Sequence, residues 1–200
     1  MNAEFILQEL LSVADLEKAK FLQKFFKTGK GQYAEGDILL GIVVPLTRDI
    51  VKRSPWLPFD EIQPLIDSPY HEARLAGFLL LAKQFKKSKN EKEKKAIFDF
   101  YLKNACKANN WDLVDVTCRD VIGSYLLDKE DRGVLYRLAE SDNLWEQRIA
   151  IVSTWTFIKH RQLDDTLTLA EKLLNHKHDL MHKAVGWMLR EVGKKDREAL

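Results

Sequence analysis

Apolar residues recur three and four positions apart along almost the whole 200-residue chain, the spacing that places them on one face of an α-helix. No sustained alternation of apolar and polar residues is flanked by Asn-Gly or Asp-Gly turns, so hairpins are not predicted. The five prolines all lie between Pro45 and Pro69, at places that suit helix starts or short connections. The pattern therefore predicts an all-α fold with helices over residues 2–11, 15–26, 45–53, 59–66, 70–86, 91–107, 111–127, 129–139, 144–159, 164–174 and 179–193.

Four segments repeat one pattern, in which a polar cluster precedes an amphipathic helix. They are HEARLAGFLLLAKQF, NWDLVDVTCRDVIGSYL, WEQRIAIVSTWTFI and HKAVGWMLREVGK, with Arg74, Asp112, Arg148 and Lys183 as landmarks 38, 36 and 35 residues apart. A short helix precedes each of the last two long ones, so the repeating unit is a HEAT-like helix pair. We therefore expect a single domain over residues 1–200, a right-handed α-solenoid whose second helices line a concave groove.

Composition supports a large core and excludes several classes of protein. Hydrophobic residues make up 46% of the chain, and a domain of this length buries roughly 70% of its unfolded surface without disulfides or metals. Cys106 and Cys118 form no disulfide framework, which indicates a reducing compartment. The N-terminal residues lack the pattern of a signal peptide, and no apolar run approaches the ~20 residues that a bilayer requires. We expect a cytoplasmic protein with no membrane partner.

The formal net charge is only +2, so any attraction to a polyanion depends on where the charges lie. Segment 83–95 carries seven lysines and two glutamates, and a solvated loop explains it better than a phosphate-binding patch. His176, His178 and His182 have a spacing that can hold a metal, but no acidic or thiolate partner completes the set. GxGxxG, GxSxG and paired-cysteine motifs are absent, so neither a metal nor a cofactor is predicted.

Trp111 and Asp115 lie four residues apart in a predicted helix, so their side chains project from one face about one turn apart. Because the same helix buries its apolar residues, Asp115 should lie at the edge between the core and the groove. A packed tryptophan and an ordinary helix acid would give the same pattern. Arg148, ahead of an apolar run, is either an ion-pair partner or a guanidinium aimed at a phosphate.

Lys183, Trp187 and Arg190 lie at positions i, i+4 and i+7, which places two cations and an aromatic ring in one stripe. Gly186 stands beside this tryptophan in mid-helix, where glycine costs about 1 kcal/mol relative to alanine. Such a glycine indicates either close contact with a neighbouring helix or a groove floor that a nucleic-acid backbone approaches.

These motifs occur together in the order and spacing of a known family. NNWDLVD, SDNLWEQRIAIV and KAVGWMLREVGK resemble the DNA alkylation repair family of HEAT-like DNA glycosylases, of the AlkD type. The segment LLGIVVPLTRDIVKR is similar to the family's Gly-Ile-x-x-Pro-x-x-Arg segment, so the resemblance spans residues 21–194. Each motif is weak alone, but four in register within one helical array are specific.

The resemblance implies a set of site residues and an activity. The family's catalytic Trp-x-x-x-Asp falls on Trp111 and Asp115, and the tryptophan of its Gly-Trp-x-Leu-Arg-Glu falls on Trp187. The implied protein is a monofunctional glycosylase of base excision repair that needs no metal or cofactor, and solenoids of this size with one groove are often monomers, so a monomer is expected. Its substrate would be double-stranded DNA containing cationic alkylpurines such as 3-methyladenine and 7-methylguanine. The residues expected to bind this DNA are Arg148, Lys183 and Arg190.

One acid is sufficient for this chemistry, because an alkylated purine is already positively charged and leaves without protonation. Asp115 can stabilise the charge that develops on the sugar, and Trp111 and Trp187 can add cation–π attraction of about 1–2 kcal/mol each. The resemblance further implies a shallow cleft rather than a deep pocket for a flipped base. Tyr33 is a candidate for contact with the lesion side. Relatives usually continue for another helix pair beyond residue 200, so an incomplete clamp on DNA is expected for this chain.

Two other functions are consistent with the same residues. A catalytically silent DNA-binding relative would keep a salt-sensitive affinity for DNA without releasing any base. A HEAT-like scaffold for protein partners, a common use of solenoids, would show neither property.

Overall fold

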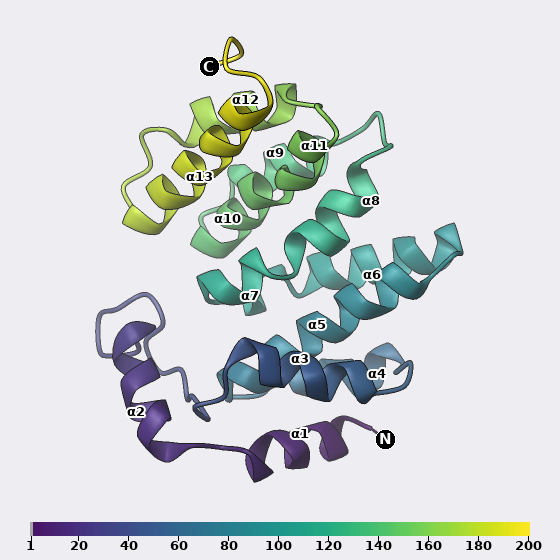
Figure 1. Cartoon of the computed structure of the whole chain (residues 1–200), viewed down its shortest axis with the longest axis vertical. Coiled ribbons are helices and arrows are strands. Elements are labelled where there is room, and N and C mark those ends of the chain that lie inside the picture. The colour runs from purple at the N-terminus through teal and green to yellow at the C-terminus, as the bar shows by residue number, and fades with distance from the viewer. Residues whose placement is uncertain (1) are drawn as a thin grey trace.

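The computed structural model describes residues 2–200, and these residues contain helices and no strand beyond an isolated bridge between Ile38 and Tyr70. Polar side chains begin several helices by accepting hydrogen bonds from first-turn N–H groups, as Asp15 does for α2 and Asn143 for α10. The helices (Figure 1) are α1 (Ala3–Ser12), α2 (Leu16–Phe25), α3 (Val44–Arg53), α4 (Phe59–Ile66), α5 (His71–Lys87), α6 (Glu91–Lys103), α7 (Trp111–Asp115), α8 (Ser124–Leu126), α9 (Gly133–Ala139), α10 (Leu144–Ser153), α11 (Trp155–Lys159), α12 (Asp164–Leu173) and α13 (Asp179–Lys195).

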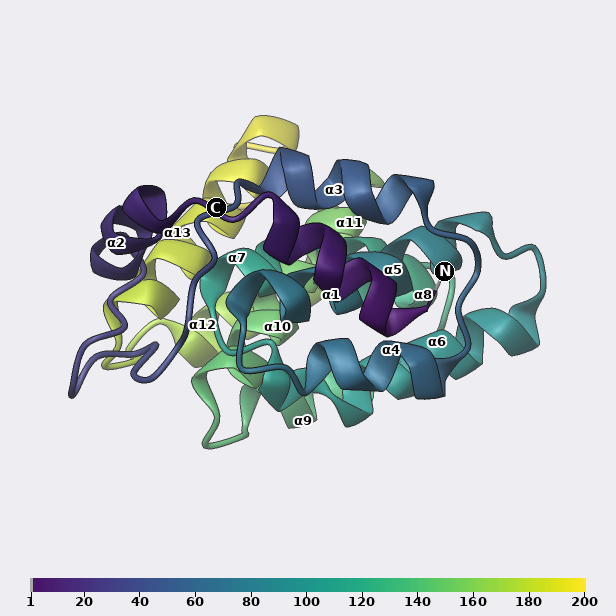
Figure 2. The ribbon, with the colours of Figure 1, turned by 90° about the horizontal axis from the view of Figure 1, so that it is seen from below.

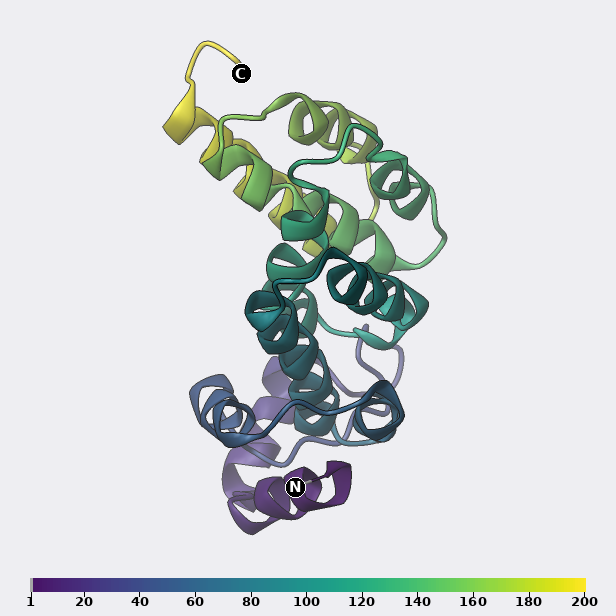
Figure 3. The same cartoon turned by 90° about the vertical axis from the view of Figure 1, so that its right-hand side faces the viewer.

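The helices stack in layers along the chain. Helix α4 packs on α5, α9 on α10 and α12 on α13, while α10 also packs on α13 in the next layer. These layers follow one another from the N-terminal to the C-terminal end of the molecule (Figures 1 and 3). Helix α5 lies in the middle and is buried on all sides, including Leu75, Phe78 and Leu81. The α-solenoid of helix pairs predicted from the sequence is confirmed.

Two helices predicted as continuous are interrupted near a threonine, and a third, 91–107, ends as α6 at Lys103 before a 3-10 turn over Ala105–Lys107. The expected helix 111–127 consists of α7, a π-helical turn over Arg119–Gly123 and α8. The expected helix 144–159 is divided into α10 and α11 at Thr154. The hydroxyl of Thr154 donates to a carbonyl three residues earlier, and that of Thr117 to one four residues earlier. Such bonds bend helices, and the apolar period continues across both breaks, so the pattern did not reveal them.

Helix α2 stands apart from the stacked pairs. Its Ala19 is buried, whereas Phe21 and Phe25 are 67% and 54% exposed. Phe26, directly after the helix, is buried, with its ring centroid 5.0 Å from that of His71 and 5.4 Å from that of Trp111. Helix α2 and the start of α13 lie on the same side of the molecule (Figures 1 and 2).

The turn that leads from the loop after α2 into α3 requires glycine at position 41. Gly41 has a φ of +83°, and a Cβ there would lie 2.1 Å from the carbonyl oxygen of Asp15. Its N–H also donates to the buried carboxylate of Glu72. We therefore expect Gly41→Ala to lower the free energy of unfolding by about 2–4 kcal/mol, measured by urea denaturation.

Gly186 is the matched control for Gly41, and its surroundings correct one interpretation made from the sequence. A Cβ at Gly186 meets no atom within 4 Å among the described residues beyond its own stretch of α13. The interpretation of Gly186 as a close contact with a neighbouring helix is therefore wrong, and an open surface remains. Because mid-helix glycine costs about 1 kcal/mol relative to alanine, Gly186→Ala should raise stability by a similar amount. Equal changes in the two variants would contradict this account of Gly41.

Candidate functional site

Asp115, at the end of α7, and Arg148, in α10, form an ion pair. Nε and Nη2 of Arg148 donate to the two carboxylate oxygens of Asp115 at 2.9 and 2.8 Å. The side chains of Asp115 and Arg148 are 15% and 6% exposed, so Asp115 lies at the edge of the core, as expected. Burial raises the pKa of Asp115 and outweighs the hydrogen bonds and charge of Arg148, which lower it. The carboxylate is thus held in one orientation with a small part facing solvent.

Arg148 connects three elements of the solenoid. Besides its two bonds to Asp115, its Nη1 donates to the carbonyl oxygen of Leu180, in the first turn of α13, at 2.5 Å. Of the two interpretations that the sequence left open, the structure shows the ion pair. Contact between Arg148 and a DNA phosphate stays a prediction.

A pocket of about 670 Å³ opens between α2 and the start of α13, and we call it the α2–α13 pocket. Trp111 and Arg148 line it, so it borders the ion pair. Its volume lies within the roughly 300–1,000 Å³ typical of small-molecule sites. Its aromatic side chains are Phe25, Tyr33 and Trp111, and its charged ones are Lys27, Arg148, Lys177, Asp179 and Lys183.

Trp187 lies beside an arginine that the sequence analysis missed. The guanidinium carbon of Arg119 is 5.8 Å from the ring centroid of Trp187 and 4.3 Å from that of Trp155. Arg119 also favours the ionised form of Asp115, in opposition to the burial that raises the pKa of this acid. It follows Asp115 by four residues, the same interval that separates Trp111 from Asp115, and this spacing is the signal that could have identified it.

Lys183 and Arg190 extend from α13 into solvent. Nζ of Lys183 lies 2.7 Å from a carboxylate oxygen of Asp179, and Nε of Arg190 lies 4.0 Å from one of Glu191. Exposed pairs of this kind contribute only about 0–1 kcal/mol, so both cations can exchange these partners for phosphates at small cost. The structure thus brings together Trp111, Asp115 and Arg148, with Lys183 on the wall of the same pocket.

The loop expected within segment 83–95 is present between two helices, but it is confined to residues 88–90. Residues 83–87 belong to α5, and α6 begins at Glu91. Nζ of Lys83 donates to the carbonyl oxygens of Val51 and Lys52 at 2.7 and 3.2 Å, and such bonds satisfy carbonyl groups at the C-terminal end of α3.

A second cavity, of about 960 Å³, lies between α3, α5 and the π-helical turn. The charged residues that line it are Arg48, Asp49, Lys52, Lys83, Lys86, Lys87, Arg119 and Asp120.

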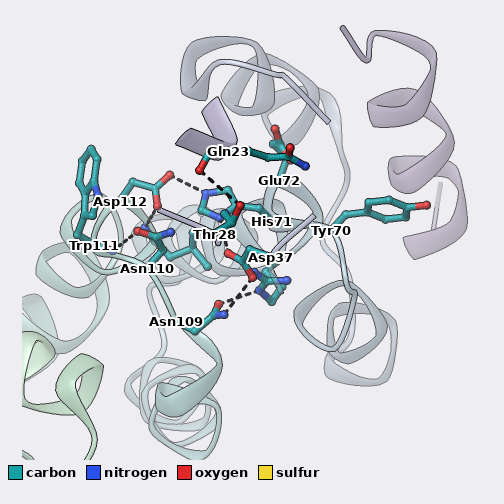
Figure 4. Close-up of polar contacts among 12 residues, drawn as sticks. Gln23, Thr28, Asp37, Tyr70, His71, Glu72, Asn109, Asn110, Trp111 and Asp112 are labelled. Atoms are coloured by element: carbon teal, nitrogen blue, oxygen red, sulfur yellow. Dashed lines mark hydrogen bonds and ion pairs between the residues drawn. The ribbon is translucent and has the colours of Figure 1, made fainter. Parts of the chain in front are cut away.

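A buried polar network adjoins Trp111 (Figure 4). Nδ1 of His71 lies 3.2 Å from a carboxylate oxygen of Asp37, and its Nε2 lies 2.8 Å from one of Asp112. Because ionised carboxylates only accept hydrogen bonds, both ring nitrogens donate and the imidazole is protonated. Arg74 bonds to Asp37 as well, so two cations and two anions balance. The network connects the loop after α2, which carries Asp37, to α7.

The charge of His71 makes stability depend on pH. Burial disfavours the charged ring, but the carboxylates of Asp112 and Asp37 outweigh it and raise the pKa of His71 from 6.5 to about 9. The folded state therefore binds this proton more tightly, and the stabilisation is complete below pH 6.5 and lost as the pH rises through 9. We expect the free energy of unfolding to fall by on the order of 3 kcal/mol across this interval, measured by urea denaturation at several pH values.

Two variants separate His71 from other titrating groups. His71→Gln should lose most of this pH dependence, whereas the exposed His182→Gln should keep it. A slope in His71→Gln as steep as in the wild type would show that another group is responsible.

The remaining candidates have structural roles. His176 and His178 accept hydrogen bonds through Nδ1 from the N–H groups of His178 and Leu180, at the start of α13. Within residues 2–200, no group of three potential metal ligands lies close together.

Cys118 is buried, and burial raises its pKa to about 12. No helix in the described part of the chain has the length and apolar character needed to cross a bilayer.

Comparison with known proteins identifies a family and a fold. The sequence model of a family described as DNA alkylation repair enzyme matches residues 6–200. A solved structure described as a predicted DNA alkylation repair enzyme from Enterococcus faecalis is similar, with a TM-score of 0.67 and 19% identity, over 93% of this chain and 86% of its own. At this identity the likeness shows the shared fold. A search of curated proteins finds no match.

Proposed function

The chain belongs to the DNA alkylation repair enzyme family, and from this premise we propose that it is a monofunctional DNA glycosylase. Its substrates are cationic alkylpurines, such as 3-methyladenine and 7-methylguanine, in duplex DNA. The observation that carries the proposal is the Asp115 carboxylate, held by two bonds from Arg148 at the border of a pocket lined by Trp111. A single, oriented acid is what removal of an already charged base requires.

The reaction follows from the charge on the base. A purine alkylated at N3 or N7 is a good leaving group, so its bond to C1′ of the sugar breaks without an acid catalyst. The electron pair stays with the base, which becomes neutral, while positive charge develops on the sugar. Asp115 stabilises this charge and accepts a proton from the water that attacks C1′. The products are the free methylated base, an abasic site and one proton.

The surroundings of Asp115 suit this role. Arg148 occupies two of about four lone-pair positions of the carboxylate, which leaves the others for water and the sugar. Because burial raises its pKa, Asp115 is a stronger base than an exposed aspartate. A low-dielectric edge of the core also strengthens its attraction for a cation.

The cations around Asp115 suit a phosphate backbone. Lys183 and Arg190 are exposed on α13, and Arg119 joins the vicinity of Asp115 to the 960 Å³ cavity rich in lysine and arginine. Each phosphate contact releases counterions and makes the affinity for DNA fall with salt. Duplex DNA therefore fits this surface better than a neutral protein partner does.

The test uses a duplex with a single 7-methylguanine. The protein is expected to release the free base and to leave the strand intact until the abasic site is cleaved with alkali, because no lysine serves as a Schiff-base nucleophile. Salt-sensitive binding without base release would instead indicate a silent DNA-binding relative. Absence of salt-sensitive DNA binding would favour a protein scaffold.

A further inference from the structure

An exposed tryptophan lies far from the Asp115 site, on the connection between α3 and α4. Trp56 is 49% exposed, whereas the other four of the five tryptophans are buried or half-buried. This connection, residues 54–58, and the turn between α5 and α6 lie on the side of the molecule away from α2 and the start of α13 (Figures 1 and 2). Tryptophan is enriched among the residues that carry the binding energy of protein interfaces. The reaction proposed at Asp115 gives Trp56 no role.

Trp56 is held on a rigid segment. Pro55 and Pro58 restrict the backbone on either side of it, because the proline ring fixes φ. The buried side chain of Gln84 accepts a hydrogen bond from the N–H of Leu57 at 3.2 Å and donates one to its carbonyl oxygen at 3.0 Å. A tryptophan on a fixed backbone loses less conformational entropy when a partner binds, which favours its use as an interface anchor.

An apolar cavity of about 270 Å³ opens beside this tryptophan, and we call it the Trp56 cavity. Its apolar lining, from the start of α4 and from α6, consists of Trp56, Leu57, Pro58, Phe59, Ala96 and Ile97. The ring of Phe59 is stacked on that of Phe100, with centroids 4.4 Å apart, so this wall is fixed as well. The volume is below the roughly 300–1,000 Å³ of small-molecule sites. The cavity therefore suits one large apolar side chain of a partner.

A more polar cavity, of about 670 Å³, lies next to it at the turn between α5 and α6. It shares Trp56 and Glu93 with the Trp56 cavity, and its cations are Lys87 and Lys89. Glu93 is the only acid in either lining, and its carboxylate accepts a hydrogen bond from Oγ of Ser88 at 2.7 Å. Trp56 thus lies between an apolar cavity and a cationic one.

The positive charge around this turn is largely uncompensated. Of the seven lysines in segment 83–95, only Lys95 forms an ion pair within residues 2–200, with Asp99 at 2.6 Å. Glu91, one of the two glutamates in the segment, is already paired with Lys129. Charges of one sign on a surface attract a partner of the opposite sign and raise its rate of association. The surface therefore favours an acidic partner.

We propose that the Trp56 cavity and the adjoining lysines bind an extended acidic segment of another protein. One large apolar side chain of the segment lies in the cavity, and its carboxylates lie beside Lys87 and Lys89. Such a segment matches both parts of the surface, whereas DNA phosphates match only the lysines. Because Trp56 lines neither the α2–α13 pocket nor the 960 Å³ cavity, a segment bound there leaves Asp115 open. The inference is independent of the reaction at Asp115.

The first test measures binding of a fluorescein-labelled peptide, in which aspartates and glutamates flank a single phenylalanine, by fluorescence polarisation. One control peptide has alanine in place of the phenylalanine, and another has asparagine and glutamine in place of the acids. The wild type should bind both controls about tenfold more weakly than the acidic peptide, and added salt should weaken binding of the acidic peptide. Equal binding of the three peptides, or no binding of the acidic one, would overturn the proposal.

The second test compares variants that keep the fold. Trp56→Ala should weaken binding of the acidic peptide about tenfold. Phe21→Ala is its matched control, because Phe21 is an exposed aromatic residue outside both cavities. Lys89→Glu should weaken binding several-fold, whereas Lys30→Glu, at an exposed loop lysine outside both cavities, should not. Urea denaturation checks that each variant is folded. Equal effects of a variant and its control would contradict the peptide site.

Other occupants of this surface give different results. Loss of duplex affinity in Trp56→Ala, without any binding of the acidic peptide, would assign the surface to flanking DNA. A concentration-dependent dimer in sedimentation that Trp56→Ala abolishes, again without peptide binding, would assign it to a second copy of this chain. Either result would overturn the proposal.

The outcomes for this surface and for the proposed function are distinct. Trp56→Ala should release 7-methylguanine at the wild-type rate, because Trp56 lies outside the Asp115 site. Base release without binding of the acidic peptide would sustain the glycosylase and overturn the peptide site. Selective binding of the peptide without base release would sustain the peptide site and overturn the glycosylase.

Discussion

Asp115→Asn is expected to lower the single-turnover rate of 7-methylguanine release by about 100- to 1,000-fold, the effect typical of removing one group that stabilises transition-state charge. Asparagine is nearly the same size, but it lacks the negative charge and cannot accept the proton of the attacking water. The affinity for duplex DNA should not fall, because the lost carboxylate repels phosphates. The rate is measured as free base released under enzyme excess, and the affinity by filter binding.

Asp120→Asn is the matched control. Asp120 is exposed, lies five residues after Asp115 and belongs to the other cavity, so its replacement should leave base release within about twofold of the wild type. A thermal unfolding curve for each variant separates lost chemistry from lost structure. Base release by a folded Asp115→Asn at the wild-type rate would remove this carboxylate from the mechanism.

The rate should also depend on pH through Asp115. Burial raises the pKa of this acid above its usual value, so its protonation begins at a higher pH than for an exposed aspartate. The rate of base release should therefore fall as the pH is lowered and Asp115 becomes protonated. The rate of Asp115→Asn should lack this decline.

Arg148→Met is expected to cost about 3–5 kcal/mol of stability, the range found when one partner of a buried ion pair is removed. Asp115 would keep its buried position but lose both hydrogen bonds and the compensating charge. The carbonyl of Leu180 would lose a donor as well, which loosens the start of α13 from α10. Urea denaturation measures the effect, and the pKa of Asp115 should rise further because its main counter-charge is absent.

The double variant Asp115→Leu with Arg148→Met tests this explanation. With both charges gone, no unpaired ion remains buried, so stability should recover most of the way to that of the wild type. Base release should not recover, because the carboxylate is absent. Arg190→Met serves as the surface control and should change stability by less than about 0.5 kcal/mol. A double variant as unstable as Arg148→Met would show that the guanidinium acts through packing and not through its charge.

The bounds of single helices could be predicted because they depend on residues close together in the sequence. Helix α4 begins at Phe59 and ends at Ile66, as expected from the apolar spacing. The placement of Asp115 at the edge of the core also followed from its helical neighbours. The breaks at Thr117 and Thr154 could not be predicted in this way, because a hydroxyl that bonds back to its own helix leaves the apolar period unchanged.

The polar contacts of the candidate site could not be predicted from the spacing of apolar residues. His71 bonds to Asp37 and Asp112, which are 34 and 41 residues away. The same limit applies to the contact of Arg119 with Trp187, because it depends on α11, which packs on both the π-helical turn and α13. Patterns of 3.6 residues describe one helix at a time and contain no information on which polar groups meet between helices.

The sequence by itself determined the all-α class, the repeated helix pair and the family resemblance, since these follow from the spacing and identity of residues along the chain. Only the tertiary structure showed that Arg148 donates to Asp115, that α2 and the start of α13 border a pocket, and that Lys83 donates to a carbonyl at the end of α3. The physical reason is that the buried face of a helix can be predicted from the spacing of its own apolar residues. The pairing of charges depends instead on distances between helices, which only their packing determines.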